Sequence, residues 1–197
     1  MSDTTIVCFS ELDIAGKQKA VEIFVDGFRN IFTFAKTKDE LIRLFSESFV
    51  DTLVYVCISE NTVVGVLGLG TSTQRALKFN KDNCKTIFGN FRGNIIYNML
   101  HKTTETPAVK NDTDLYIDYL ATDSNMRNKG IATELLTFAF DLPKYKDCYI
   151  EVLSKNTIAA MLYKKLGFSI YKKSFHIFTF LQRLGNPILM KKSKFIS

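Results

Sequence analysis

The sequence predicts a single mixed α/β domain. Strand-like and helix-like runs alternate along all 197 residues, and no internal repeat, linker or low-complexity segment interrupts them. Hydrophobic residues make up 46% of the chain and charged residues 23%, which suits one sizeable core and excludes wholesale disorder. One domain is therefore expected to span residues 1–197.

The first third of the chain contains signals for a strand, two helices and a hairpin. The predicted elements are a strand at 5–9, helices at 10–31 and 39–49, and hairpin arms at 53–58 and 63–69. Ser10 is placed to cap the first helix. In that helix Ala20, Ile23 and Phe24 begin a series of apolar residues at spacings of three and four, which predicts one buried stripe.

Residues 71–112 do not resemble sheet. Cys84, Ile87 and Phe88 begin a series with helical spacing, but Gly89 and Gly93 weaken it by about 1 kcal/mol each. The pattern predicts two short helices or one bent helix.

The rest of the chain returns to alternating elements. They are a strand at 115–122, a helix at 130–140, a strand at 148–153, a helix at 156–166, and strands at 168–171 and 187–190. Gly65, Gly68 and Gly70 fall inside a strand pattern, which favours a bulge or a close backbone approach over a phosphate-binding turn.

Charge and cysteine usage narrow the class of protein. Residues 152–197 hold nine Lys or Arg and no acid, against 17 basic and 20 acidic residues in 1–151. A basic third can be a solvated face or can attract a polyanion.

The four cysteines stand singly, so no zinc site is expected, and Cys57 and Cys148 are predicted to be buried. Without a signal peptide or a membrane-spanning run, the expected location is the cytoplasm.

The most informative segment is a polar loop between a strand and a helix that opens at Gly130. Backbone N–H groups at a helix start are unpaired, and the helix dipole adds positive charge there. Gly130 and Ala132 are small enough for a phosphate to approach the backbone, while Arg127 and Lys129 supply full charges. The segment therefore predicts a phosphate site, although it lacks the Walker pattern.

Three motifs in this half of the chain resemble one known family. The segment Arg127-Asn-Lys-Gly130-Ile-Ala132 resembles the R/Q-x-x-G-x-G/A signature of the GNAT superfamily of acetyl-CoA-dependent N-acetyltransferases. Residues 119–122 are similar to the family's pantetheine-binding strand, and residues 151–168 resemble its N-x-x-A-x-x-L-Y-x-x-x-G-F block. The resemblance covers about residues 113–171 and implies a mostly antiparallel central sheet flanked by helices.

The resemblance also implies how acetyl-CoA binds. The backbone from Arg127 to Thr133 would cradle the pyrophosphate, and the strand before it would hold the pantetheine. Asn156 would hydrogen-bond the cofactor arm or cap its own helix. The implied cofactor-binding residues are Leu120, Ala121, Thr122, Arg127, Asn128, Lys129, Gly130, Ile131, Ala132, Thr133 and Asn156.

Two residues are implied to be catalytic. By resemblance Tyr163 is the general acid for the leaving thiolate, although its spacing alone favours a core aromatic. Asp118 is the candidate general base, because it lies two residues before Leu120 and should share that face of the strand with Asp114. A solvated carboxylate is the alternative. His101 and His176 are candidates by residue type only.

The expected function is direct transfer of an acetyl group from acetyl-CoA to an amine of a small molecule or peptide. A non-catalytic acyl-CoA-binding or regulatory module of the same fold is the alternative. No motif supports a nucleic-acid binder, so no nucleic-acid partner is expected. No membrane partner and no metal are expected either. The chain could be a monomer or a homodimer.

One region departs from the family pattern. About residues 75–110 form a helical insertion before the cofactor-binding strand, where the family normally has a short turn. It is basic and rich in aromatic residues. Its role is open between a lid over the acceptor site, an oligomer contact and a packed surface helix.

Overall fold

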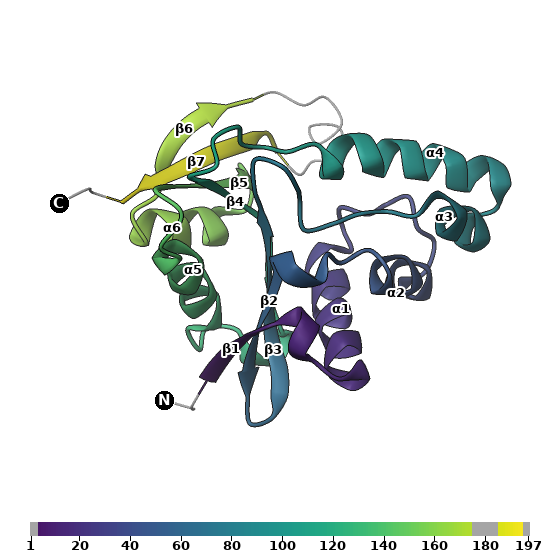
Figure 1. The fold of residues 1–197 in the computed structure, drawn as a ribbon, viewed down its shortest axis with the longest axis horizontal. Coiled ribbons are helices and arrows are strands. Elements are labelled where there is room, and N and C mark those ends of the chain that lie inside the picture. The colour runs from purple at the N-terminus through teal and green to yellow at the C-terminus, as the bar shows by residue number, and fades with distance from the viewer. Residues whose placement is uncertain (1–3, 175–184, 195–197) are drawn as a thin grey trace.

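The computed structural model describes residues 4–174 and 185–194, which form one seven-stranded sheet with helices on both faces (Figure 1). The strands are β1 (Thr4–Cys8), β2 (Val54–Ser59), β3 (Thr62–Gly70), β4 (Asp114–Thr122), β5 (Asp147–Leu153), β6 (Ser169–Lys173) and β7 (Pro187–Ser193). Their order in the sheet is β1-β2-β3-β4-β5-β7-β6. Only β4 and β5 run parallel, so the predicted mostly antiparallel sheet is confirmed.

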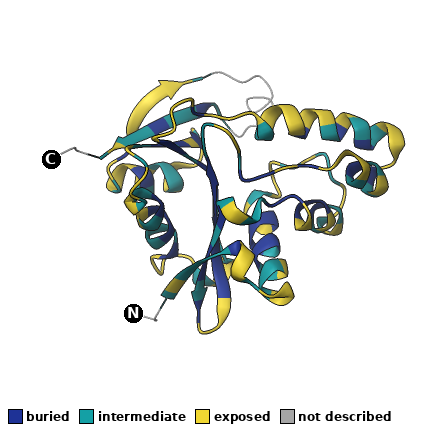
Figure 2. Ribbon diagram, in the orientation of Figure 1, coloured by how far each residue is buried: buried dark blue, intermediate teal, exposed yellow. Residues whose placement is uncertain are grey.

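Six α-helices lie among the described residues. They are α1 (Ile14–Phe28), α2 (Lys38–Ser46), α3 (Lys81–Phe88), α4 (Asn90–Leu100), α5 (Ile131–Asp141) and α6 (Thr157–Lys165). Helices α1 to α4 lie on one side of the sheet, and α5 and α6 lie on the other (Figure 1). The sheet therefore separates two hydrophobic cores. In Figure 2 the central strands are mostly dark, hence buried, and the helices on either side are partly exposed.

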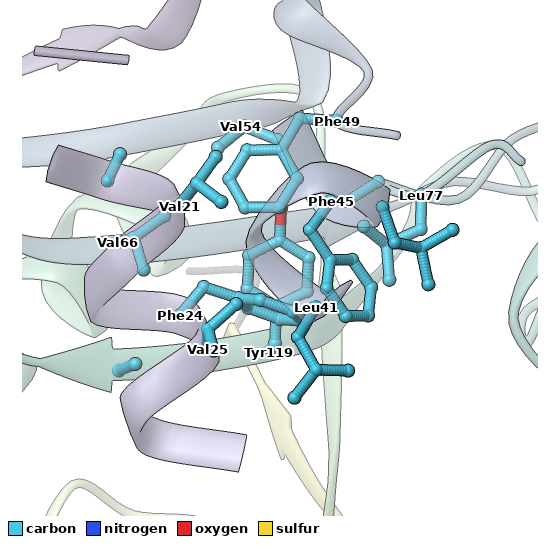
Figure 3. Close-up of a cluster of buried hydrophobic side chains, with 14 of the residues drawn as sticks. Val21, Phe24, Val25, Leu41, Phe45, Phe49, Val54, Val66, Leu77 and Tyr119 are labelled. Carbon is cyan, nitrogen blue, oxygen red and sulfur yellow. The ribbon is translucent and has the colours of Figure 1, made fainter. Parts of the chain in front are cut away.

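The core on the α1 side is built around aromatic rings. Phe24 of α1 is 1% exposed, and Figure 3 shows it between the sheet and α2. Its ring contacts five others at centroid distances of 4.6 to 5.8 Å, namely Phe28, Phe32, Phe45, Phe49 and Tyr119. The contacts with Phe45, Phe49 and Tyr119 are edge-on, and ring pairs of this kind stabilise the folded state beyond the area they bury. They hold α1 and α2 against the strand that carries the expected cofactor site.

The cysteines are free thiols. Cys57 and Cys148 are buried, as predicted, and so is Cys84. Burial raises the pKa of Cys57 to about 11 and that of Cys148 to about 12. These thiols act as small apolar side chains.

The insertion forms two helices, so the prediction of two short helices is confirmed over that of one bent helix. Gly89 separates α3 from α4 with φ of 83°, a left-handed value that only glycine adopts easily. Cys84, Phe88, Ile96 and Leu100 belong to the α1-side core. The insertion is thus part of the main core, and a π-helix (His101–Glu105) leads from it toward β4.

Two helix starts differ from their predicted positions. The Asp13 carboxylate accepts a hydrogen bond from Gly16 N at 2.7 Å, so Asp13 caps α1. Ser10 lies instead inside a short 3-10 turn. Helix α2 is capped by Thr37 and ends at Ser46, earlier than predicted. Both starts follow from which polar side chain reaches the free N–H groups.

A bulge in β4 confirms the expectation drawn from the glycine cluster. Gly68 pairs with Tyr119 and Leu69 with Ile117, so Asp118 is an extra residue on β4. A Cβ on Gly68 would lie 2.3 Å from the Tyr119 ring, which explains why glycine stands there. Because of the bulge, Ile117 packs into the α5 side core and Tyr119 into the α1 side core.

The contact between α3 and α4 yields a test of the fold. A Cβ on Gly93 would lie 2.4 Å from the carbonyl oxygen of Cys84, so Gly93→Ala must push the two helices apart. We expect it to lower the free energy of unfolding by about 1–3 kcal/mol in urea titrations. Asn98→Ala, at an exposed position of the same helix, should change it by only a few tenths of a kcal/mol. Equal stability of Gly93→Ala and wild type would contradict this packing.

Candidate active site

The candidate site lies where β4 and β5 part. Their parallel pairing runs from Asp114 opposite Asp147 to Ile117 opposite Ile150 and stops there. Beyond this pair β5 continues with β7, while β4 continues with β3 alone. Within residues 4–174 and 185–194, the β4 backbone from Asp118 to Thr122 therefore has no strand partner on its β5 side, which leaves its polar groups able to bind a ligand.

The loop after β4 presents a row of free backbone donors. No described residue accepts a hydrogen bond from the backbone N–H of any residue from Arg127 to Thr133. Asn128 and Gly130 have left-handed φ values of 62° and 90°, and the space where a Gly130 Cβ would lie is open. Together with the start of α5 this conformation makes an anion-binding concavity. The free amides and the open space at Gly130 fit a pyrophosphate group.

Lys19 of α1 anchors this loop, a role that sequence patterns did not reveal. Its ammonium group lies 2.6 Å from the Asp123 carboxylate, which also accepts a hydrogen bond from Asn125 N at 2.9 Å. The hydrogen bond from Lys19 lowers the pKa of Asp123. Because the two residues are far apart in the sequence, only the packing of α1 on β4 brings them together.

Tyr163 lies on the buried face of α6, in the core on the α5 side. It is 7% exposed, and burial raises the pKa of its phenol to about 12. Its hydroxyl has no hydrogen-bond partner within the described part of the chain. Asn156 caps the same helix, since its side-chain oxygen accepts a hydrogen bond from Ala159 N at 3.2 Å. The capping role expected for Asn156 is thus present.

Asp118 faces the opposite side of the sheet from Leu120. Leu120 packs with the α5-side core, whereas the Asp118 carboxylate forms an ion pair with Arg75 and accepts a hydrogen bond from Ala76 N at 2.6 Å. The prediction that the two residues share a face is wrong, because the bulge shifts the alternation of side chains along β4. Burial raises the pKa of Asp118, and the Arg75 guanidinium opposes that shift.

The Arg75 side chain joins the insertion to β4. Its guanidinium lies 4.8 Å from the centre of the Tyr116 ring and donates a hydrogen bond to the Thr106 carbonyl at 3.1 Å. Burial, followed by the Glu151 charge, raises the pKa of Tyr116. Asp118 thus holds both ends of the insertion in place.

Glu151 is a further acid beside the site that sequence reasoning missed. On β5 the neighbours Ile150 and Val152 are buried in the α5-side core, so the exposed Glu151 faces the side of Tyr116 and Asp118. Alternation of buried and polar residues along this strand was the available signal.

The other sequence candidates lie elsewhere or outside the described residues. Asp114 is buried and bonds to Asn111, and His101 pairs with Glu105 at 3.1 Å within the insertion. His176 lies outside the described residues. Across residues 4–174 and 185–194, no group of three or more His, Cys, Asp or Glu is placed to hold a metal ion, and no helix could cross a bilayer.

The row of free backbone amides at the start of α5 thus lies next to the point where β4 and β5 part. The sequence profile of the Acetyltransferase (GNAT) family matches residues 20–168, so the chain belongs to this family. No curated protein sequence matched the chain. Members of the family use acetyl-CoA as acyl donor.

Solved structures show the same fold at low sequence identity. A histone acetyltransferase HPA2 and related acetyltransferase from Corynebacterium glutamicum is 19% identical, covers 100% of this chain and 99% of its own, and superposes with a TM-score of 0.67. A GCN5-related N-acetyltransferase from Kribbella flavida is 13% identical, with coverages of 97% and 98% and a TM-score of 0.62. An N-acetyltransferase from Staphylococcus aureus is 20% identical, with coverages of 89% and 92% and a TM-score of 0.58.

The loop geometry yields a binding test with a matched control. Gly130→Glu places bulk and negative charge beside the free amides, so we expect it to abolish coenzyme A binding in calorimetry. Gly89→Glu adds the same side chain at a similar left-handed φ and in equally open space, but in the insertion. Backbone strain should cost Gly130→Glu about 1–2 kcal/mol of stability and Gly89→Glu, whose ψ of 157° is one that almost only glycine adopts, about 1–3 kcal/mol. Wild-type affinity in Gly130→Glu would disprove the site.

Proposed function

We propose that this protein transfers the acetyl group of acetyl-CoA directly to an amine of a small molecule or peptide. The observation that carries the proposal is the row of free amides at residues 127–133 beside the unpaired half of β4. The four free cysteines are consistent with a reducing compartment, and we place the protein in the cytoplasm. Its oligomeric state can be monomer or homodimer.

The residues have separate tasks in binding. Acetyl-CoA supplies the acyl group as an activated thioester. The amides from Arg127 to Thr133 would hold its pyrophosphate, with Arg127 and Lys129 adding charge. The β4 backbone at Leu120, Ala121 and Thr122 would hold the pantetheine. Asn156 would shape the start of α6 and so place Tyr163.

The pKa of Tyr163 defines how it can act. A phenol with a pKa of about 12 stays protonated at neutral pH and can donate to the leaving sulfur. Full transfer to a thiolate with a pKa of about 8.5 would be uphill by about 5 kcal/mol. Tyr163 would therefore stabilise the developing thiolate chiefly through a hydrogen bond, which a water-poor site strengthens.

The acceptor amine must also lose a proton, and two carboxylates are candidates. Asp118 remains a proposal as base, although both of its oxygens already have partners. Glu151 lies next to the end of the β4–β5 pairing and is exposed. Because of its position beside the parting strands, we assign proton acceptance to Glu151, directly or through water, and give Asp118 the task of holding Arg75 and the insertion.

A turnover screen tests the proposal against a non-catalytic acyl-CoA-binding module. Free thiol release from acetyl-CoA is measured with a panel of amines that includes amino acids, peptides, polyamines and aminoglycosides. An enzyme releases thiol in an acceptor-dependent way. Tight coenzyme A binding without turnover on any amine would favour the regulatory module.

The proposed role of Tyr163 predicts a loss of kcat that does not depend on pH between about 7 and about 9. Tyr163→Phe should lower kcat by about 10²–10³-fold, the usual cost of losing one preorganised hydrogen-bond donor, while leaving coenzyme A affinity nearly unchanged. Because the phenol stays protonated well above neutral pH, the ratio of wild-type to variant kcat should be the same at about pH 7 and about pH 9. A loss below about threefold would reduce Tyr163 to a packing role.

The base assignment predicts different outcomes for two isosteric changes. Glu151→Gln should lower kcat/KM by about 10²–10⁴-fold with little change in the thermal unfolding midpoint. Asp118→Asn should lower the midpoint, because it leaves the Arg75 guanidinium without its charged partner. If Glu151→Gln keeps its activity and Asp118→Asn loses it without unfolding, Asp118 is the base.

A further inference from the structure

Strand β6 forms an open edge of the sheet. It is last in the strand order and pairs only with β7 among the described residues. All five of its residues are exposed, as Figure 2 shows along the whole strand. An edge strand offers unpaired N–H and C=O groups to another extended chain.

An apolar groove of about 330 Å³ runs between β6 and α6. Ile170 of β6 and Met161 of α6 line it, with Val152 and Met190 beneath them. Met161 is 63% exposed and Ile170 46% exposed, and Ile158 beside them on α6 is 77% exposed. Apolar side chains gathered and exposed in this way mark interaction surfaces.

The groove is surrounded by unpaired positive charge. Lys164 lines it, and Lys173 lies on the same face of β6 as Ile170, because their partners on β7 both pack toward the α5-side core. Within the described residues Lys164, Lys165 and Lys173 form no ion pair. Residues 152–197 contain no acid. A second copy of this surface would be repelled, whereas an acidic partner would be attracted.

We propose that this surface, formed by β6 and the exposed side of α6, binds an acidic extended segment of a partner protein. The segment adds a strand along the outer edge of β6 and places an apolar side chain in the groove. Main-chain hydrogen bonds supply affinity in this binding mode, and pockets for alternate side chains supply specificity. A membrane or a nucleic acid would satisfy the lysines but not the unpaired edge.

A labelled peptide of alternating Glu and Leu residues tests the proposal by fluorescence polarisation on the full chain. We expect saturable binding that weakens as salt is added. Met161→Glu and Lys173→Glu should each weaken it by about tenfold or more. Met99→Glu, an equivalent change on the exposed side of α4, should leave it unchanged. Thermal unfolding checks that each variant is folded.

Two further probes separate the strand pairing from other attractions. The same peptide with alternate backbone amides methylated keeps its charge but cannot pair as a strand, so it should lose binding. Binding that survives methylation, that coenzyme A displaces, or that Met161→Glu leaves intact would overturn the proposal. So would stronger binding of anionic vesicles or an oligonucleotide than of the peptide.

Discussion

The site depends on the unequal pairing of one strand. β4 pairs with β3 from Tyr116 to Thr122 but with β5 only as far as Ile117. Backbone polar groups inside a protein need partners, so an unpaired half-strand between two sheet halves is stable only when water or a ligand satisfies it. The same stretch contains the Asp118 bulge. Because of the bulge, Ile117 packs into the α5-side core and Tyr119 into the α1-side core, so this part of β4 is fixed to both hydrophobic cores.

The insertion is linked to the same strand and to the segment after α1. Arg75 joins it to the bulge, Glu105 accepts a hydrogen bond from Phe79 N at 2.9 Å, and Arg92 donates to the Phe34 carbonyl. These contacts fix the insertion against β4 and against the segment after α1. The insertion is therefore fixed to the strand that carries the candidate site.

Local patterns predicted most of the fold and the place of the free backbone amides after β4. Apolar spacing located the helices, and the free amides of residues 127–133 follow from a glycine at a helix start. The face of Asp118 could not be predicted, because it depends on a bulge in the pairing with β3, a relation between strands separated by the insertion. The Lys19–Asp123 ion pair could not be predicted from the sequence either, because the two residues are far apart in the chain and meet only through the packing of the fold. Glu151 was accessible from strand alternation, since Ile150 and Val152 flank it.

The buried thiols have a practical consequence for assays. Cys57, Cys84 and Cys148 are buried, and burial raises the pKa of each, so almost none of their thiolate is present near neutral pH. Cys8 is half-buried, with its sulfur 3.1 Å from the Asp51 carbonyl. A colorimetric thiol reagent should therefore react little with the cysteines of the folded protein. Its signal would come from released coenzyme A, and a rising background would report unfolding.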